Sequence, residues 1–134
     1  MPGAVDAALY STLSAGTALT TALGGTFIYN QYAPPTVNLP YVVFSLASGL
    51  EEHMTPHDSE RRVYLVKAVA TSLGSAVVLA EHIDALLHKQ FLTITGYVNF
   101  WTSRDTIIQY LEYDPAGVVY GHAGGEYVIR VEQS

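Results

Sequence analysis

The sequence predicts an α+β fold, with two helices packed on one face of a mainly antiparallel sheet and a C-terminal β-hairpin. Apolar residues at helical spacing open the chain, a second helical stripe occupies its middle, and strand-like segments are grouped between and after them. Because helices and strands are segregated rather than strictly alternating, a parallel α/β sheet is disfavoured. We expect one domain spanning residues 1–134, with a flexible loop at about residues 49–60.

The first helical segment covers residues 5–23, where apolar side chains recur every four positions. Gly16 interrupts this segment, and Thr17 is expected to cap a short second part. The glycine pair at 24–25 is a typical helix end. A short strand is expected at residues 26–29.

The next third of the sequence is predicted to form two long strands joined by a polar loop. Three prolines make residues 31–40 an extended connector. Residues 41–47 are β-branched and aromatic, which favours a central strand, and residues 62–71 form the second strand. This second strand is apolar on both rows, so we expect helices on one face and a neighbouring subunit on the other. Residues 49–60 between the strands are about twice as long as an ordinary hairpin loop, which is typical of functional segments.

The main helix is expected at residues 72–89. Its buried stripe is predicted to comprise Ala76, Val77, Ala80, Ile83 and Leu87, and its outward face to carry Glu81 and Asp84. A short strand at residues 92–95 follows and ends in a turn at Gly96.

The last third is predicted to be strand-rich. Strands at residues 97–101 and 106–113 lead to a turn at residues 114–117, where Asp-Pro-Ala-Gly is a strong hairpin signal. Residues 118–132 return along the hairpin. We expect a bulge or bend at the glycine pair 124–125.

Composition indicates a surface that is covered by partners. Only 13% of the residues are Asp, Glu, Lys or Arg, whereas soluble domains average about 25%. Apolar residues make up 49% of a chain with 134 residues, a size that exposes much surface for its volume. The net charge is −6 with six basic residues, which disfavours a phosphate-gripping surface. Without cysteine the chain cannot form disulfides, and without an 18-residue apolar run we expect no membrane contact.

A metal site and an enzyme are both disfavoured. His53 and His57 have the spacing of zinc ligands on a helix, but Pro56 lies between them and opposes a helix. A solvated or partner-facing loop is the stronger reading of that segment. The chain has no nucleophile elbow, phosphate loop or well-placed carboxylate pair, so we predict no catalytic residues and no cofactor.

Tyrosine carries more information, since ten are present and Tyr is enriched in protein contacts. Most are expected to be sheet formers and half-buried core. Some are expected to anchor an interface together with the polar loop. The candidate interface residues are Tyr41, Tyr64, Tyr110, Tyr127, Glu51, Glu52, His53, His57 and Asp58.

The order of segments resembles a known family. The N-terminal helix reads Ala-Leu-Tyr-Ser-Thr-Leu-Ser at residues 8–14, and Ala-Leu-Thr-Thr-Ala-Leu-Gly-Gly follows at residues 18–25. Ile-Tyr-Asn at 28–30 precedes the proline connector and Leu-Pro-Tyr-Val-Val-Phe at 39–44, and the main helix ends in Ile-Asp-Ala-Leu-Leu at 83–87. Over about residues 4–131 this resembles the tail-terminator, or tail-completion, proteins of long-tailed (siphovirus-like) bacteriophages.

The resemblance implies a structural role without catalysis. Such proteins form a hexameric ring that ends tail-tube growth, presents a docking surface to the head or neck, and lets DNA pass through its lumen. The implied partners are further copies of the chain, the major tail tube protein, a head-completion or neck protein, and viral DNA without specific binding. The implied location is the tail–neck junction of the virion, after assembly in the host cytoplasm. Ring contacts are expected at residues 41–46 and 63–69 and on the final hairpin, with the loop at 51–58 reaching the tube or the lumen.

Three alternatives remain open from the sequence. A head-completion, neck or other minor tail protein would show a similar pattern. A small ligand-binding domain that dimerises would require a closed apolar pocket. An enzyme would require the histidines to converge in space.

Overall fold

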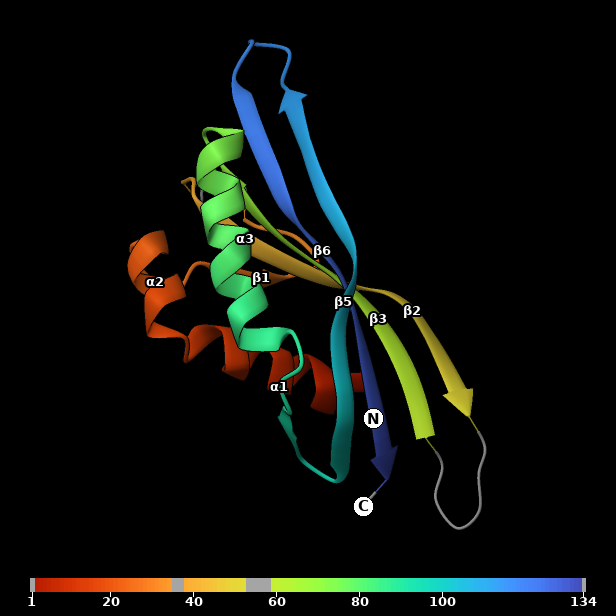
Figure 1. Cartoon of the computed structure of the whole chain (residues 1–134). Coiled ribbons are helices and arrows are strands. Elements are labelled where there is room, and N and C mark those ends of the chain that lie inside the picture. Colours follow the sequence, from red (N-terminus) through yellow and green to blue (C-terminus); the bar gives the residue numbers. More distant parts are fainter. Residues whose placement is uncertain (1, 35–37, 53–58, 134) are drawn as a thin grey trace.

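The computed structural model describes residues 2–34, 38–52 and 59–133 (Figure 1). These described residues form three helices and six strands. In chain order these are α1 (Pro2–Ser14), α2 (Thr17–Leu23), β1 (Ile28–Asn30), β2 (Tyr41–Glu52), β3 (Ser59–Ala70), α3 (Leu73–Leu87), β4 (Thr93–Ile94), β5 (Tyr97–Tyr113) and β6 (Val119–Gln133). The predicted α+β class, the mainly antiparallel sheet and the C-terminal hairpin are confirmed.

The six strands form one sheet in the order β1-β2-β3-β6-β5-β4. Only the three-residue pairing of β1 with β2 is parallel among the described strands. The last strand, β6, therefore lies between β3 and β5. The predicted central strand at 41–47 is in fact second from one edge, because β1 covers it only from Val42 to Phe44.

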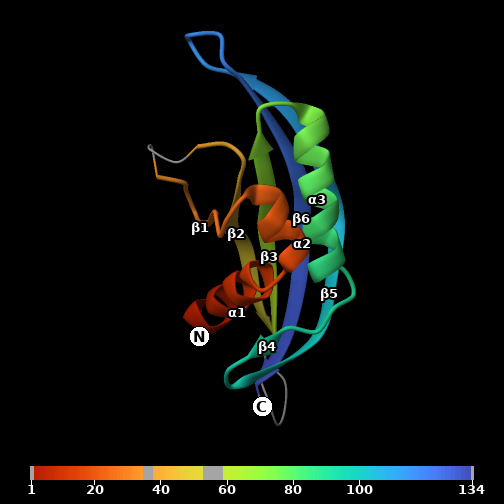
Figure 2. The same ribbon diagram turned by 90° about the vertical axis from the view of Figure 1, so that its left-hand side faces the viewer.

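All three helices lie on the same face of the sheet, in front of it in the view of Figure 2. The core between these layers is built from the buried faces of the helices and of β3 and β6. On β3, Tyr64, Val66 and Ala68 are fully buried beneath the helices, whereas Val63 and Leu65 on the opposite row are only partly buried. The expected helix cover is confirmed, and the other face is open in the single chain.

The N-terminal segment forms two helices, divided at Gly16 as predicted. Gly16 is the N-cap of α2 with an extended backbone, and Thr17 is its first residue, so the prediction that Thr17 caps α2 is wrong. A Cβ on Gly16 would lie 2.4 Å from a methyl carbon of Leu86, so glycine permits this turn to approach α3 closely. Gly24 ends α2 in the left-handed conformation, as predicted.

The long strands extend further than predicted. β2 continues through residues 49–52 and β3 begins at Ser59, so both enter the segment predicted as loop. Cross-strand pairing, with Glu51 opposite Glu60, sustains this extension. Residues 53–58 lie outside the described part of the chain.

Helix α3 begins with a side-chain cap, in which the Ser75 N–H donates to Ser72 Oγ at 3.2 Å. Its buried stripe contains Leu79 where Val77 was predicted, because positions 76, 79, 80, 83 and 87 share one helical face. Asp84, predicted to face solvent, accepts a hydrogen bond of 2.8 Å from the Tyr127 hydroxyl.

The final third contains one continuous strand, β5, where two were predicted. Irregularities in its pairing lie between Asn99 and Trp101 and between Arg104 and Thr106. Of the bulge or bend predicted at the glycine pair 124–125, the bulge is wrong, since β6 pairs with β3 there without interruption. A Cβ on Gly124 would lie 2.0 Å from the Val66 carbonyl oxygen, so this position needs glycine for close backbone approach.

The predicted hairpin turn is confirmed. The Gly117 N–H donates to the Asp114 carbonyl at 2.9 Å, and Gly117 has a φ of 85°. The Asp114 carboxylate accepts from the N–H groups of Ala116 and Val118 at 2.9 and 2.8 Å. Among the described helices, none combines the length and apolar character needed to cross a membrane.

Candidate functional site

The open face of the sheet carries a chain of polar and aromatic contacts. Lys67 Nζ donates to the Tyr110 hydroxyl at 2.8 Å and lies 5.4 Å from the centre of the Tyr110 ring. The Tyr110 ring stacks on the His122 ring with centroids 4.4 Å apart and planes inclined by 7°. Three strands, β3, β5 and β6, thus place these side chains in one row. Tyr110 remains 42% exposed.

His122 is nearly buried in this row, and burial lowers its pKa below the ordinary value of 6.5. The imidazole is therefore neutral at pH 7. Its Nε2 lies 2.8 Å from Glu112 Oε1, and because a carboxylate can only accept, Nε2 carries the proton. The hydrogen bond to Glu112 opposes part of the pKa shift.

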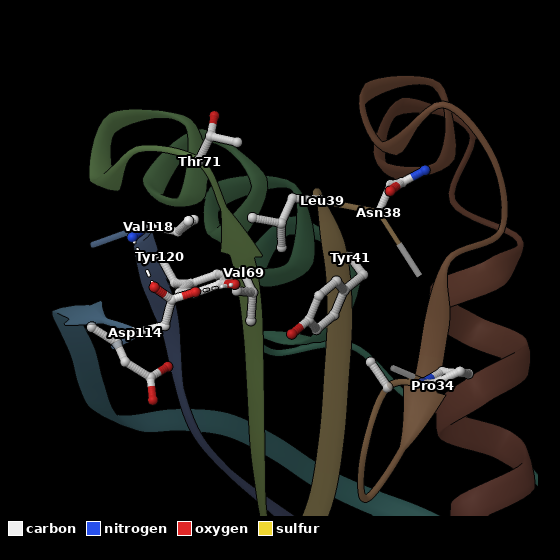
Figure 3. Close-up of a pocket in the computed structure, with 11 residues that line it drawn as sticks. Pro34, Asn38, Leu39, Tyr41, Val69, Thr71, Asp114, Val118 and Tyr120 are labelled. Carbon is white, nitrogen blue, oxygen red and sulfur yellow. Dashed lines mark hydrogen bonds between the residues drawn. The ribbon is translucent and has the colours of Figure 1, made fainter. Parts of the chain in front are cut away.

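Tyr41 lies at the margin of the same face, in an open pocket of about 600 Å³. Figure 3 shows its ring between the proline connector, with Pro34 and Asn38, and the hairpin, with Asp114. Burial, and then the charge of Glu112, raise the pKa of the Tyr41 hydroxyl.

The carboxylates of this pocket already have partners. Asp114 holds the turn and also accepts from the Tyr120 hydroxyl at 3.3 Å, while Glu112 pairs with His122. The pocket is open, and polar side chains such as Glu112 and Asp114 line it, so it does not match the closed apolar pocket that a ligand-binding domain would require.

Two of the four candidate interface tyrosines belong to the core. Tyr64 and Tyr127 are fully buried beneath the helices, which corrects the expectation that they contact a partner. The Tyr64 hydroxyl donates to the Asp6 carboxylate on α1 and accepts from Arg62 Nε at 3.2 Å. Burial is the main cause that raises the pKa of both tyrosine hydroxyls.

The candidate residues of the polar loop are only partly placed. Glu51 is exposed near the end of β2, and Glu52 is the last residue of that strand. His53, His57 and Asp58 lie outside the described residues. Within the described ranges, no three His, Asp or Glu side chains are grouped as a metal site would require.

The sequence reading missed β5 as the main exposed apolar element. Several large apolar side chains on this strand are strongly exposed, among them Phe100, Trp101, Ile107, Leu111 and Tyr113. The available signal was that residues 106–113 carry apolar side chains on both rows, with Glu112 as their single charge.

Comparisons with known proteins identify a matching family and a solved structure with the same fold. A family model described as tail completion protein gp17 matches residues 7–114, which is most of the chain. A chain in the solved structure of the virion of a native gene transfer agent particle shares the fold, with a TM-score of 0.75 and 18% identity. The match covers 98% of this chain and 96% of that chain. No curated protein sequence matches.

Proposed function

This chain belongs to the tail completion protein gp17 family of structural, non-enzymatic tail components of phage-like virions, and on that premise we propose that it forms a ring at the head-proximal end of the tail tube. The ring ends tube growth and provides the docking surface for the head or neck. Its partners are further copies of the chain, the tail tube protein and a neck protein. It is assembled in the host cytoplasm and stays at the tail–neck junction.

The observation that carries this proposal is the open sheet face. Helices cover one face of β3, while Val63 and Leu65 on the other remain partly exposed in the single chain. A small domain with so few charges gains stability when another copy covers such a surface. Tyr41 and Tyr110 lie on this face, and we retain them as contact residues.

A ring also gives the acidic residues at the end of β2 a role. Glu51 and Glu52 would face the lumen, and the segment that follows them in sequence adds a further acidic residue, Asp58. Like charge repels DNA phosphates, so DNA would pass without sticking.

Native mass spectrometry tests the ring, with the purified chain measured alone and then with tail tubes that lack their upper end. We expect a hexamer in at least the second condition, and capped tubes that no longer elongate. A stable dimer that ignores the tubes would overturn the proposal in favour of a ligand-binding domain.

The position in the particle separates a terminator from a neck protein. Gold-labelled chain, viewed by electron microscopy on headless tails, is expected at the upper tip of each tube. Label found on tail-less heads instead would assign the chain to head completion.

A further inference from the structure

The sheet has an unpaired outer edge on each side. β4 pairs with β5 only through Tyr97 and Val98, and the connector after α3 bonds the backbone of β5 only as far as Arg104. On the other side, β1 pairs with β2 only up to Phe44. Within the described chain, residues 105–113 of β5 and 45–50 of β2 therefore have no backbone partner on their outer sides.

Both edges lack the lysine and proline that commonly protect an edge strand, although each has one irregularity, between Leu46 and Ser48 on β2 and between Arg104 and Thr106 on β5. Natural edge strands are shielded by lysine, proline, bulges or a covering segment. Residues 105–113 contain neither lysine nor proline, and Ile107, Leu111 and Tyr113 are 62, 45 and 66% exposed. The β2 edge also lacks lysine and proline and exposes Leu46 and Leu50, by 44 and 57%. Both edges are therefore suited to backbone pairing with another chain.

The polarity of the strands makes the two edges complementary. Three successive antiparallel pairings connect β2 to β5, so these strands run in opposite directions. A second copy in the same orientation, placed beside the sheet, offers its β2 antiparallel to β5 of the first. We propose that residues 105–113 of one copy pair as a strand with residues 45–50 of the next, an inference that rests on the proposed ring. Different surfaces then meet at each contact, as a closed head-to-tail ring requires.

The register also constrains the geometry of the assembly. Through the paired strands, Gln109 lies level with Val42, whereas the middle of the β2 edge lies about five residues further along. Neighbouring copies must therefore be offset along the strand direction by about 17 Å. Strands inclined to the ring axis provide such an offset, as tilted strands do in closed barrels.

Disulfide trapping tests the pairing without background, because the chain has no cysteine. Leu46→Cys on β2 and Gln109→Cys on β5 place thiols at exposed positions of the two edges, on the same helix-side face of the sheet. Leu111→Cys in place of Gln109→Cys samples the neighbouring register on the same face. We expect oxidation of a variant carrying one cysteine on each edge to yield a covalent ladder of subunits, on tail tubes if the chain is monomeric alone.

Two controls distinguish the possible outcomes. Each single-cysteine variant should remain uncross-linked, and a pair joining Gln109→Cys to Val78→Cys on α3 should give no ladder. Cross-linking of Gln109→Cys to itself would overturn the head-to-tail contact, because it indicates a two-fold β5–β5 interface. A hexamer without any β2–β5 cross-link would overturn the pairing and leave the proposed ring standing, whereas a chain monomeric in every condition would overturn both.

A charge substitution gives a second, independent test. Ile107→Lys with Leu111→Lys introduces the protection that the β5 edge lacks, while both positions remain exposed in the single chain. We expect an unchanged far-ultraviolet circular dichroism spectrum and loss of the ring. Val78→Lys on α3, 52% exposed, is the matched control and should assemble normally. An intact ring in the double lysine variant would contradict the pairing.

Discussion

Tyr64 on β3 and Tyr127 on β6 lie directly opposite each other, and their hydroxyl groups donate to carboxylates on two different helices. Tyr64 reaches Asp6 on α1, and Tyr127 reaches Asp84 on α3. Both side chains are fully buried. This cross-strand pair therefore connects the centre of the sheet to two of its covering helices, α1 and α3.

Removing either hydroxyl should lower stability. Tyr127→Phe deletes one charge-assisted hydrogen bond in a buried site and Tyr64→Phe deletes two, to Asp6 and from Arg62, and we expect a loss of at least about 1–2 kcal/mol each in the free energy of unfolding. Urea denaturation at a concentration where the chain is monomeric measures this loss. Tyr113→Phe, at an exposed position, should change stability by less than about 0.5 kcal/mol. Equal losses of stability in all three variants would show that the two buried hydroxyl groups contribute no more than the exposed hydroxyl of Tyr113.

Gly124 should not tolerate a methyl group. In Gly124→Ala the Cβ would meet the Val66 carbonyl oxygen at 2.0 Å and the Lys67 Cα at 2.6 Å, both of them backbone atoms. We expect a loss of about 3 kcal/mol or more, because two central strands would have to move apart. Thermal unfolding of the purified variant is the measurement.

Gly74→Ala provides the matched control for that substitution. Gly74 lies in the first turn of α3, and a Cβ there would meet no atom within 4 Å. Alanine should leave stability unchanged or raise it by up to about 1 kcal/mol, since glycine is a poor helix former. If Gly124→Ala unfolded at the same temperature as Gly74→Ala, this would contradict the close approach of β6 to β3.

Stability should fall on acidification through His122. Because the folded pKa lies below the unfolded value of 6.5, the unfolded chain binds the proton more tightly. This contribution is complete above about pH 6.5 and is lost as the pH falls through that value towards the folded pKa. Denaturation curves of the chain and of His122→Gln between pH 7.5 and about 5 isolate the effect. We expect the free energy of unfolding of the wild-type chain to fall more steeply with decreasing pH than that of His122→Gln. Parallel profiles would show that His122 does not cause the pH dependence.

Reversal of charge at the end of β2 should slow DNA passage. In Glu51→Lys with Glu52→Lys, cations replace the anions that we place in the lumen, and DNA phosphates would bind them. The rate of DNA ejection should fall at low salt and recover as salt screens the attraction. Glu81→Lys, on the exposed face of α3, is the control and should eject normally. An unchanged ejection rate in the double variant, with the ring intact, would remove the support for a lumen-facing β2 end.

Local chemistry in the sequence predicted the turns and helix ends well. Gly24 and the Asp114–Gly117 turn act as their residue types suggest, because each depends on contacts within a few positions. The order of the elements, and the family resemblance that came with it, are confirmed. The acidic residue Asp84 was misplaced because its partner, Tyr127, is 43 positions away.

The candidate site was less predictable for the same reason. Alternation along a strand shows that both rows are apolar, but not which row the helices cover or where an edge is left open. Tyr64 and Tyr110 look alike in sequence, yet one is buried beneath α1 and the other lies on the open face. The exposed edge of β5 follows from how short β4 is, and no pattern within β5 itself shows that.

The central position of β6 has a consequence for biosynthesis. Residues 119–133 come last among the strands, yet they fill the gap between β3 and β5. Until they leave the ribosome, two long apolar strands lack their neighbour, and no local hairpin can replace it because β3 pairs across some 60 positions of sequence. Such non-local pairing is slow to form and prone to aggregation while it is incomplete. Nascent chains should thus depend on chaperones until residues 119–133 have been synthesised, and a stop codon within β6 should yield insoluble protein rather than a smaller folded domain.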